Sequence, residues 1–166
     1  MEPEVSIKIT SNWSTPVEFS WERRALLPRP ALKGVSLTSM TIRDSNLSCF
    51  RVEGCVFHSC TFESCSLESA SFGRCEFIDC SFVDTDLSFA TLAECSFTDC
   101  QFVRVKLRGA SLLETDFGIL PSDSLDVSTV RWTEGTKWPT WLTDSNLIRI
   151  SDDEIFRRME TGEPLP

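Results

Sequence analysis

Cysteine is the residue type in this sequence with the widest potential chemistry, and its spacing is regular. Seven of the eight cysteines fall on multiples of five, namely Cys55, Cys60, Cys65, Cys75, Cys80, Cys95 and Cys100. Cysteines bind soft metals or pair as disulfides, but these seven keep a strict five-residue spacing and form no CxxC pair. We interpret them as small apolar packing residues and predict no metal and no other cofactor. Cys49 lies off this register, and we expect it to face outward as the one reactive thiol.

Catalysis by a triad would need a histidine beside a nucleophile and a carboxylate. His58 is the only histidine, and we expect it to face outward. The sequence shows no nucleophile or carboxylate arrangement that this histidine would serve as a base. We therefore predict no catalytic residue and a protein that is not an enzyme.

Carboxylates and apolar side chains occupy positions that we also expect to face outward. The acidic ones are Asp79, Asp84, Glu94, Asp99 and Glu114, and the apolar ones are Ile78, Val83 and Val103. Like charges stacked on neighbouring strands are destabilising, and exposed apolar residues often mark a contact, so we predict that these eight form a partner-binding surface. Two alternatives remain open: a solvated acidic face, and apolar residues covered by one of the flanking segments.

A five-residue period must position all of these residues. A large apolar side chain recurs at every fifth position, namely Leu32, Leu37, Ile42, Leu47, Val52, Phe57, Phe62, Leu67, Phe72, Phe77, Phe82, Leu87, Leu92, Phe97, Phe102, Leu107, Leu112 and Phe117. This period fits neither an α-helix nor a β-strand, so the chain must turn after each short extended piece. It therefore coils, as repeat proteins do.

A second period of 20 residues shows how many pieces close one coil. Identical residues recur at this spacing in three columns: Phe57, Phe77, Phe97 and Phe117; Leu47, Leu67, Leu87 and Leu107; and Phe62, Phe82 and Phe102. Four pentapeptides thus make one turn, with the large residue and the small one two positions before it both facing the core. Roughly four and a half coils at ~4.8 Å each give a rod about 21 Å long.

The tandem units resemble the pentapeptide-repeat family, whose loose consensus is Ala-Asp/Asn-Leu-X-X. The nearest matches are Ser45-Asn46-Leu47, Thr85-Asp86-Leu87 and Thr115-Asp116-Phe117, although cysteine often stands where alanine is typical. The resemblance covers about half of the chain and implies an all-β, right-handed quadrilateral parallel β-helix. It implies much less about function, because a fold does not fix an activity.

We divide the chain into residues 1–30, a capping hairpin; residues 31–119, the β-helix; and residues 120–166, a tryptophan-rich cap and helix. Two alternating apolar runs, 5–9 and 17–21, flank a turn-prone segment and predict the hairpin. After Phe117 the five-residue rule stops, and we expect Trp132, Trp138 and Trp141 to plug the far end.

The last segment begins with a capping box, Ser151-Asp152-Asp153-Glu154, which predicts a short helix. Phe156 and Met159 would lie on one face of that helix. We therefore predict that these two residues form the contacts of a possible homodimer.

Charge and the N-terminal sequence limit the partners. The net charge is −9 with a pI near 4.6, and we find no basic patch, so neither direct nucleic-acid binding nor membrane binding is expected. The N-terminus carries neither a secretory signal nor an apolar span, so we expect a cytoplasmic protein. Our leading hypothesis is a non-enzymatic scaffold that binds a protein partner.

The resemblance implies one alternative, because some bacterial family members are acidic, rod-shaped dimers that occupy the DNA-binding saddle of DNA gyrase and protect it from inhibitors. Residues 31–119 carry twelve acids and seven bases, a net charge of −5. A DNA duplex of the same length carries about twelve negative charges. The DNA mimic is therefore the second hypothesis.

Overall fold

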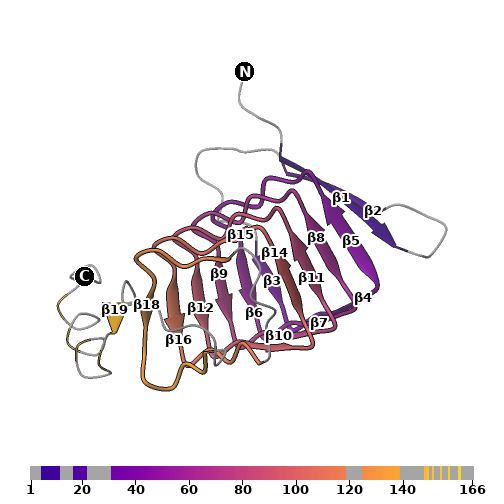
Figure 1. Ribbon diagram of the computed structural model, residues 1–166. Coiled ribbons are helices and arrows are strands. Elements are labelled where there is room, and N and C mark those ends of the chain that lie inside the picture. Colours follow the sequence, from indigo (N-terminus) through magenta and orange to yellow (C-terminus); the bar gives the residue numbers. More distant parts are fainter. Residues whose placement is uncertain are drawn as a thin grey trace.

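The structure, a computed structural model, describes residues 5–11, 17–21, 31–118, 125–138, 148–149, 151, 154, 157 and 161. Short strands follow one another around a parallel β-solenoid of about five turns, as Figure 1 shows. The strands form four sides, which we number as faces 1 to 4 in the order in which the chain visits them. The predicted four-sided coil is thus confirmed.

The strands of each face pair in parallel at a spacing of 20 residues, except β18 and β19, which pair at a spacing of 17. Face 1 comprises β3 (Ala31–Lys33), β6 (Arg51–Glu53), β9 (Ser71–Gly73), β12 (Thr91–Ala93), β16 (Ser111–Leu113) and β18 (Arg131–Trp132), followed by β19 (Ile148–Arg149). Face 2 comprises β4 (Ser36–Thr38), β7 (Val56–His58), β10 (Glu76–Ile78) and β13 (Ser96–Thr98).

Face 3 contains β5 (Met40–Arg43), β8 (Thr61–Glu63), β11 (Ser81–Val83) and β14 (Gln101–Val103). Face 4 consists of single bridges from Asn46 through Ser66 and Asp86 to Lys106, and it ends in the pair β15 (Val105–Lys106) and β17 (Leu125–Asp126).

A residue with a left-handed backbone stands at each corner between two faces. Asp79 has a φ of 54°, Phe89 of 58° and Glu94 of 53°. This conformation costs an L-residue about 1–2 kcal/mol, yet it turns the chain within one residue. The corner N–H groups stay in the ladder between coils, since Asp79 donates to the Thr98 carbonyl at 2.9 Å. Inter-coil hydrogen bonds thus hold the strained corners in place.

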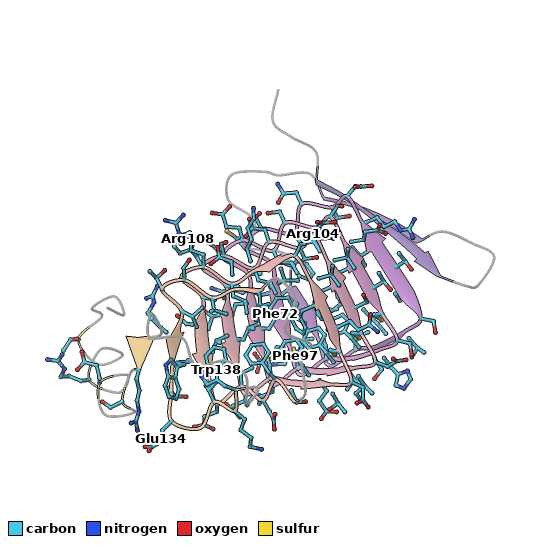
Figure 2. All side chains as sticks on the ribbon, viewed as in Figure 1. Phe72, Phe97, Arg104, Arg108, Glu134 and Trp138 are labelled. Atoms are coloured by element: carbon cyan, nitrogen blue, oxygen red, sulfur yellow. The ribbon has the colours of Figure 1, made fainter. Side chains whose placement is uncertain are left out.

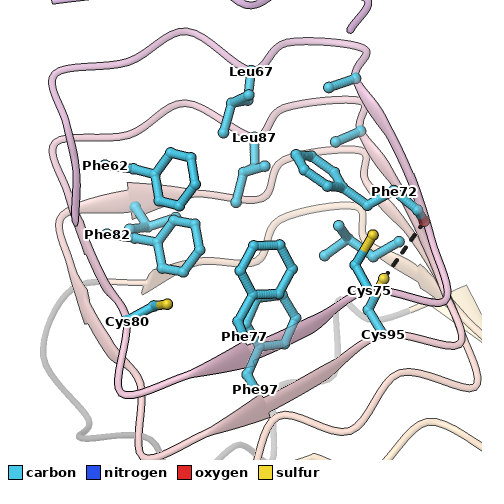
Figure 3. Packing of buried hydrophobic residues seen from close by; sticks show 14 of the residues in the cluster. Phe62, Leu67, Phe72, Cys75, Phe77, Cys80, Phe82, Leu87, Cys95 and Phe97 are labelled. Atoms are coloured by element: carbon cyan, nitrogen blue, oxygen red, sulfur yellow. Dashed lines mark hydrogen bonds between the residues drawn. The ribbon is translucent and has the colours of Figure 1, made fainter. Parts of the chain in front are cut away.

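The core consists of the predicted columns. The rings of Phe57, Phe77, Phe97 and Phe117 stack with centroids 4.8–5.2 Å apart, and those of Phe62, Phe82 and Phe102 stack at 4.9 Å. The two columns meet edge to face, as Figure 3 shows for Phe77 and Phe82. Leu47, Leu67, Leu87 and Leu107 are buried beside them. The core prediction is confirmed.

The seven cysteines on the five-residue register are buried, and each S–H points toward backbone carbonyls. Cys65 Sγ donates to the Ile42 carbonyl at 3.3 Å, and the Thr85 hydroxyl makes the matching bond to the Phe62 carbonyl at 3.2 Å. Burial raises the pKa of the Cys65 thiol. These cysteines therefore pack as small neutral donors, whereas Cys49 is partly exposed at a corner.

The expectation that the five-residue rule stops at Phe117 is wrong. Val127 lies 20 residues after Leu107 and is buried, and Trp132 pairs with Leu112 in face 1. Trp138 stacks on Phe117 at 5.5 Å, at a spacing of 21. The Thr136 hydroxyl donates to the Leu112 carbonyl, 24 positions earlier, whereas the equivalent bond from Thr115 to Leu92 spans 23 positions. One extra residue before Thr136 therefore explains the shift from 20 to 21. Trp132 and Trp138 close the far end; Trp141 lies outside the described residues.

The N-terminal strands form the predicted hairpin. β1 (Val5–Ser11) pairs antiparallel with β2 (Val17–Trp21), and β1 also pairs antiparallel with β5. The hairpin thus extends face 3 beyond the first coil. At the other end, the predicted helix with Phe156 and Met159 lies outside the described residues. Its capping contact is seen, because the Glu154 N–H donates to Ser151 Oγ at 3.3 Å.

Candidate interaction surface

The structure divides the eight predicted surface residues among three corners. We name each corner by the two faces that it joins. Asp79 and Asp99 stack at corner 2/3, between faces 2 and 3, with Ile78 beside Asp79. Glu94 and Glu114 stack at corner 1/2, where the Glu94 N–H donates to the Leu113 carbonyl. These five residues border face 2. Asp84, Val83 and Val103 lie instead at the far edge of face 3.

Face 2 is a sheet between two corner rows that carry stacked carboxylates, and Arg74 precedes Glu94 by one coil in one of them. Among the described residues, Asp79, Asp99, Glu94 and Glu114 make no ion pair within 4 Å. Glu76 adds a fifth exposed carboxylate to the middle of the face. Two unit charges about 5 Å apart repel by about 1 kcal/mol in water, so the rows favour a cationic neighbour. We call face 2 with its two borders the acidic face.

Asp84 does not contribute to this surface. Arg104 donates from Nε and Nη2 to its two carboxylate oxygens, each at 2.6 Å. This guanidinium lowers the pKa of Asp84 and neutralises its charge. Val83 and Val103 pair next to this ion pair and are half-buried. The eight residues that we grouped from the sequence therefore form two separate surfaces. Asp84, Val83 and Val103 lie together, and the other five residues border face 2.

The match to known proteins follows the same repeats. Residues 55–120 match the family model described as "Pentapeptide repeat region". This part of the chain is a pentapeptide-repeat region. No curated protein sequence matches it.

Solved structures share the fold of this pentapeptide-repeat protein at low identity. The pentapeptide repeat protein Rfr23 from the cyanobacterium Cyanothece 51142 is 14% identical over 73% of this chain and 88% of its own, with a TM-score of 0.52. QnrB1, a plasmid-mediated fluoroquinolone resistance protein, is 11% identical over 84% and 100%, with a TM-score of 0.33. HetL, involved in heterocyst differentiation regulation in Nostoc sp. strain PCC 7120, is 17% identical over 72% and 67%, with a TM-score of 0.27.

One polar group in the pentapeptide-repeat protein brings serine, histidine and aspartate together. Ser59 Oγ donates to Asp79 Oδ2 at 3.0 Å and lies 3.0 Å from His58 Nδ1. In a catalytic triad the histidine stands between the nucleophile and the carboxylate, whereas here the serine stands between the other two. The histidine is also exposed. This group therefore fixes the Asp79 side chain and lacks the geometry of a triad.

The sequence reasoning missed the ion pairs between successive coils. Their partners lie 20 or 21 positions apart: Arg43 with Glu63, Arg74 with Glu53, Arg104 with Asp84, Lys106 with Asp86, and Lys137 with Asp116. The 20-residue period, applied to opposite charges, would have found three of them. Figure 2 shows charged side chains along the outside of the solenoid, with Arg104 labelled.

Two further searches bear on function. No three side chains of the metal-binding types converge within the part of the chain that the structure describes. No helix in that part is long and apolar enough to cross a membrane.

Proposed function

We propose that this protein is a non-enzymatic binding module whose acidic face receives a protein partner with a basic surface. The observation that carries the proposal is the contrast between corners. Asp79, Asp99, Glu94 and Glu114 stand in like-charged rows, whereas Asp84 is neutralised by a bidentate arginine. Lys137 likewise neutralises Asp116 on face 2, but these four corner carboxylates make no ion pair within 4 Å among the described residues.

The rigidity of the rows supports a binding role. The corner backbones are held by inter-coil hydrogen bonds of 2.7 Å at Glu94 and 2.9 Å at Asp79, and Ser59 fixes the Asp79 carboxylate. A preorganised row loses little conformational freedom when a partner binds. Complementary charge chiefly accelerates encounter and gives specificity, so we expect binding that weakens at high salt.

The non-enzymatic part of the proposal rests on the polar groups of the described faces. The Asp79, Ser59 and His58 group lacks triad geometry, and the seven thiols on the five-residue register are buried and donate to backbone carbonyls. A thiol nucleophile needs an exposed thiolate. Binding without turnover is the function these arrangements favour.

The test compares two variants with equal charge changes. The acidic-face variant carries Asp79→Asn, Asp99→Asn, Glu94→Gln and Glu114→Gln; the control carries Glu53→Gln, Glu63→Gln, Asp84→Asn and Asp86→Asn. Each is immobilised beside the wild type, and partners are captured at low salt and identified. We expect a partner held by the wild type and the control and lost by the acidic-face variant. Equal capture by all three proteins would refute the assignment of the face.

The second candidate is a DNA mimic that binds DNA gyrase and protects it from inhibitors. Two parallel rows of carboxylates along the coil axis favour it, because a duplex presents two rows of phosphates. The ion pairs of Asp84 and Asp86 reduce the charge of the other faces, and the pair of Asp116 with Lys137 reduces it at one end of face 2. Excess protein should alter supercoiling by gyrase, with or without a quinolone, if this candidate is right; unchanged supercoiling would eliminate it.

A further inference from the structure

Two vertical ladders of cysteine run inside the solenoid, one at each border of face 2. The first contains Cys55, Cys75 and Cys95, and the second contains Cys60, Cys80 and Cys100. All six side chains are at most 3% exposed. Figure 3 shows Cys75 and Cys95 as neighbouring rungs beside the stacked rings of Phe77 and Phe97.

The rungs of a ladder have the same side-chain orientation. Cys80 Sγ donates to the carbonyls of Phe57 at 3.3 Å and Ile78 at 3.4 Å. Cys100 Sγ makes the same two contacts one coil later, to Phe77 at 3.3 Å and Thr98 at 3.5 Å. Sulfurs in equivalent orientations repeat at the spacing between successive coils. Ring centroids of phenylalanines in successive coils are 4.8–4.9 Å apart, which gives this spacing. Neighbouring sulfurs are thus ~4.8 Å apart.

This spacing matches a soft metal ion held in line between two sulfurs. A metal–thiolate bond is about 2.3 Å long, so a linear S–metal–S unit spans about 4.6 Å. Thiolates select Cu(I) among the common metals. Because no three ligands converge in the described residues, the ladders offer a two-coordinate site and no tetrahedral one.

We propose that each cysteine ladder binds one soft monovalent ion of the Cu(I) and Ag(I) class between two neighbouring rungs. The two thiols lose two protons and one Cu(I) ion forms two Cu–S bonds, which leaves one net negative charge. A sulfur cannot hold ions in line on both of its sides, so the third rung keeps its proton. Backbone N–H groups face the negative charge, as the Cys60 N–H does at 3.4 Å from Cys80 Sγ.

The ladder predicts a stoichiometry that depends on which rungs are present. Two ladders with one ion each hold two Cu(I) ions per chain. Cys75→Thr with Cys80→Thr removes both middle rungs, leaves sulfurs ~9.6 Å apart, and should hold none. Cys55→Thr with Cys60→Thr removes the same number of thiols but only end rungs, so it should hold two ions. Threonine suits these positions because Thr115 continues the first ladder and bonds to the Leu92 carbonyl at 2.9 Å.

The experiment uses the full chain with Cys49→Ser, which removes the partly exposed thiol. Each protein is refolded without oxygen in Cu(I) buffered by bicinchoninate, desalted and analysed for copper per chain. Circular dichroism checks the fold, and Cys→Ala versions replace any threonine variant that fails to fold. A ratio of two in the parent and the end-rung variant and none in the middle-rung variant, with a linear two-sulfur signature by X-ray absorption, supports the proposal. No retained copper in the parent, or equal ratios in the two double variants, would overturn it.

Discussion

Single corner residues carry much of the backbone strain of this fold. Fifteen described residues other than glycine have a positive φ, among them Phe89 at 58° and Arg104 at 53°. Side chains of every chemical kind occur there, so position in the coil and not residue type decides the conformation. Glycine is required only where a side chain would also collide, and Gly109 is such a position.

Gly109→Ala should destabilise the protein more than Gly54→Ala. Both residues have a positive φ, so each alanine costs about 1 kcal/mol in backbone strain. A Cβ at Gly109 would also lie 2.6 Å from Phe89 Cε1, whereas nothing lies within 4 Å of one at Gly54. Urea unfolding measures both losses. In a Phe89→Ala background, Gly109→Ala should reduce the free energy of unfolding no more than Gly54→Ala does. If the larger loss at Gly109 persists, the Phe89 ring is not its cause.

Phe97→Ala should reduce the free energy of unfolding by about 3–5 kcal/mol, because it opens a cavity within two stacked columns. Phe89→Ala is the matched control. Its ring is 51% exposed, so the loss should be below about 1 kcal/mol. Equal losses for the two variants would contradict the assignment of Phe97 to the core.

At the scale of elements, ion pairs join successive coils, and Asp116 with Lys137 is one of those near the far end. The ammonium of Lys137 is 2.8 Å from Asp116 Oδ2. This contact and the Gly118 N–H lower the pKa of Asp116, and the carboxylate raises the pKa of Lys137. A carboxyl group whose pKa is lowered by folding stabilises the fold at pH values above its unfolded-state pKa of about 3.9. This stabilisation is lost as the pH falls through the folded-state pKa.

Lys137→Met should therefore lower the urea midpoint at pH 6, and the difference from wild type should shrink toward pH 2. Asp116 is then protonated in both proteins, so the lysine has no charge to attract. Lys33→Met is the control, since no ion pair within 4 Å joins Lys33 to another described residue. A difference that is constant with pH would show that packing of the lysine stem, and not its charge, causes the effect.

The sequence predicted the elements where the period is unbroken and failed where one position departs from it. From Leu32 to Phe117 every fifth residue is large and apolar. The strands of each described face follow this five-residue register. Ser122 breaks the apolar series and Lys137 precedes Trp138 by one position, so the continuation through Val127 and Trp132 was overlooked. Pairing across coils overrides such a local interruption, because β18 bonds to β16 regardless of the residues between them.

Surface chemistry was less predictable for a geometric reason. The sequence indicates that a residue faces outward, but corners separate outward residues that are close in sequence. Asp79 and Asp84 are five positions apart, yet they stand at opposite edges of face 3, and only Asp84 meets an arginine. The eight predicted surface residues are therefore divided among three corners, and their role in binding a partner stays a prediction.

At the scale of the whole molecule, the two ends of the solenoid differ. The hairpin of β1 and β2 extends face 3 beyond the first coil. At the far end Trp138 covers Phe117 and Trp132 covers Leu112. Coils of this kind stack on any matching neighbour, so how the ends are covered determines whether the rod stays single.

Our last prediction concerns the segment after this end, with its possible dimer contacts Phe156 and Met159. We expect the intact chain to be a dimer by light scattering and a chain that ends before Ser151 to be a monomer with the same thermal midpoint, because the helix adds contacts between rods and not within one. Phe156→Glu with Met159→Glu in the full chain should act like the truncation. If the intact chain is a dimer, the carboxylate rows are doubled in length, which favours the gyrase hypothesis. If the intact and the truncated chain are both monomers, the rows are too short to replace DNA, which favours a single basic protein partner on the acidic face.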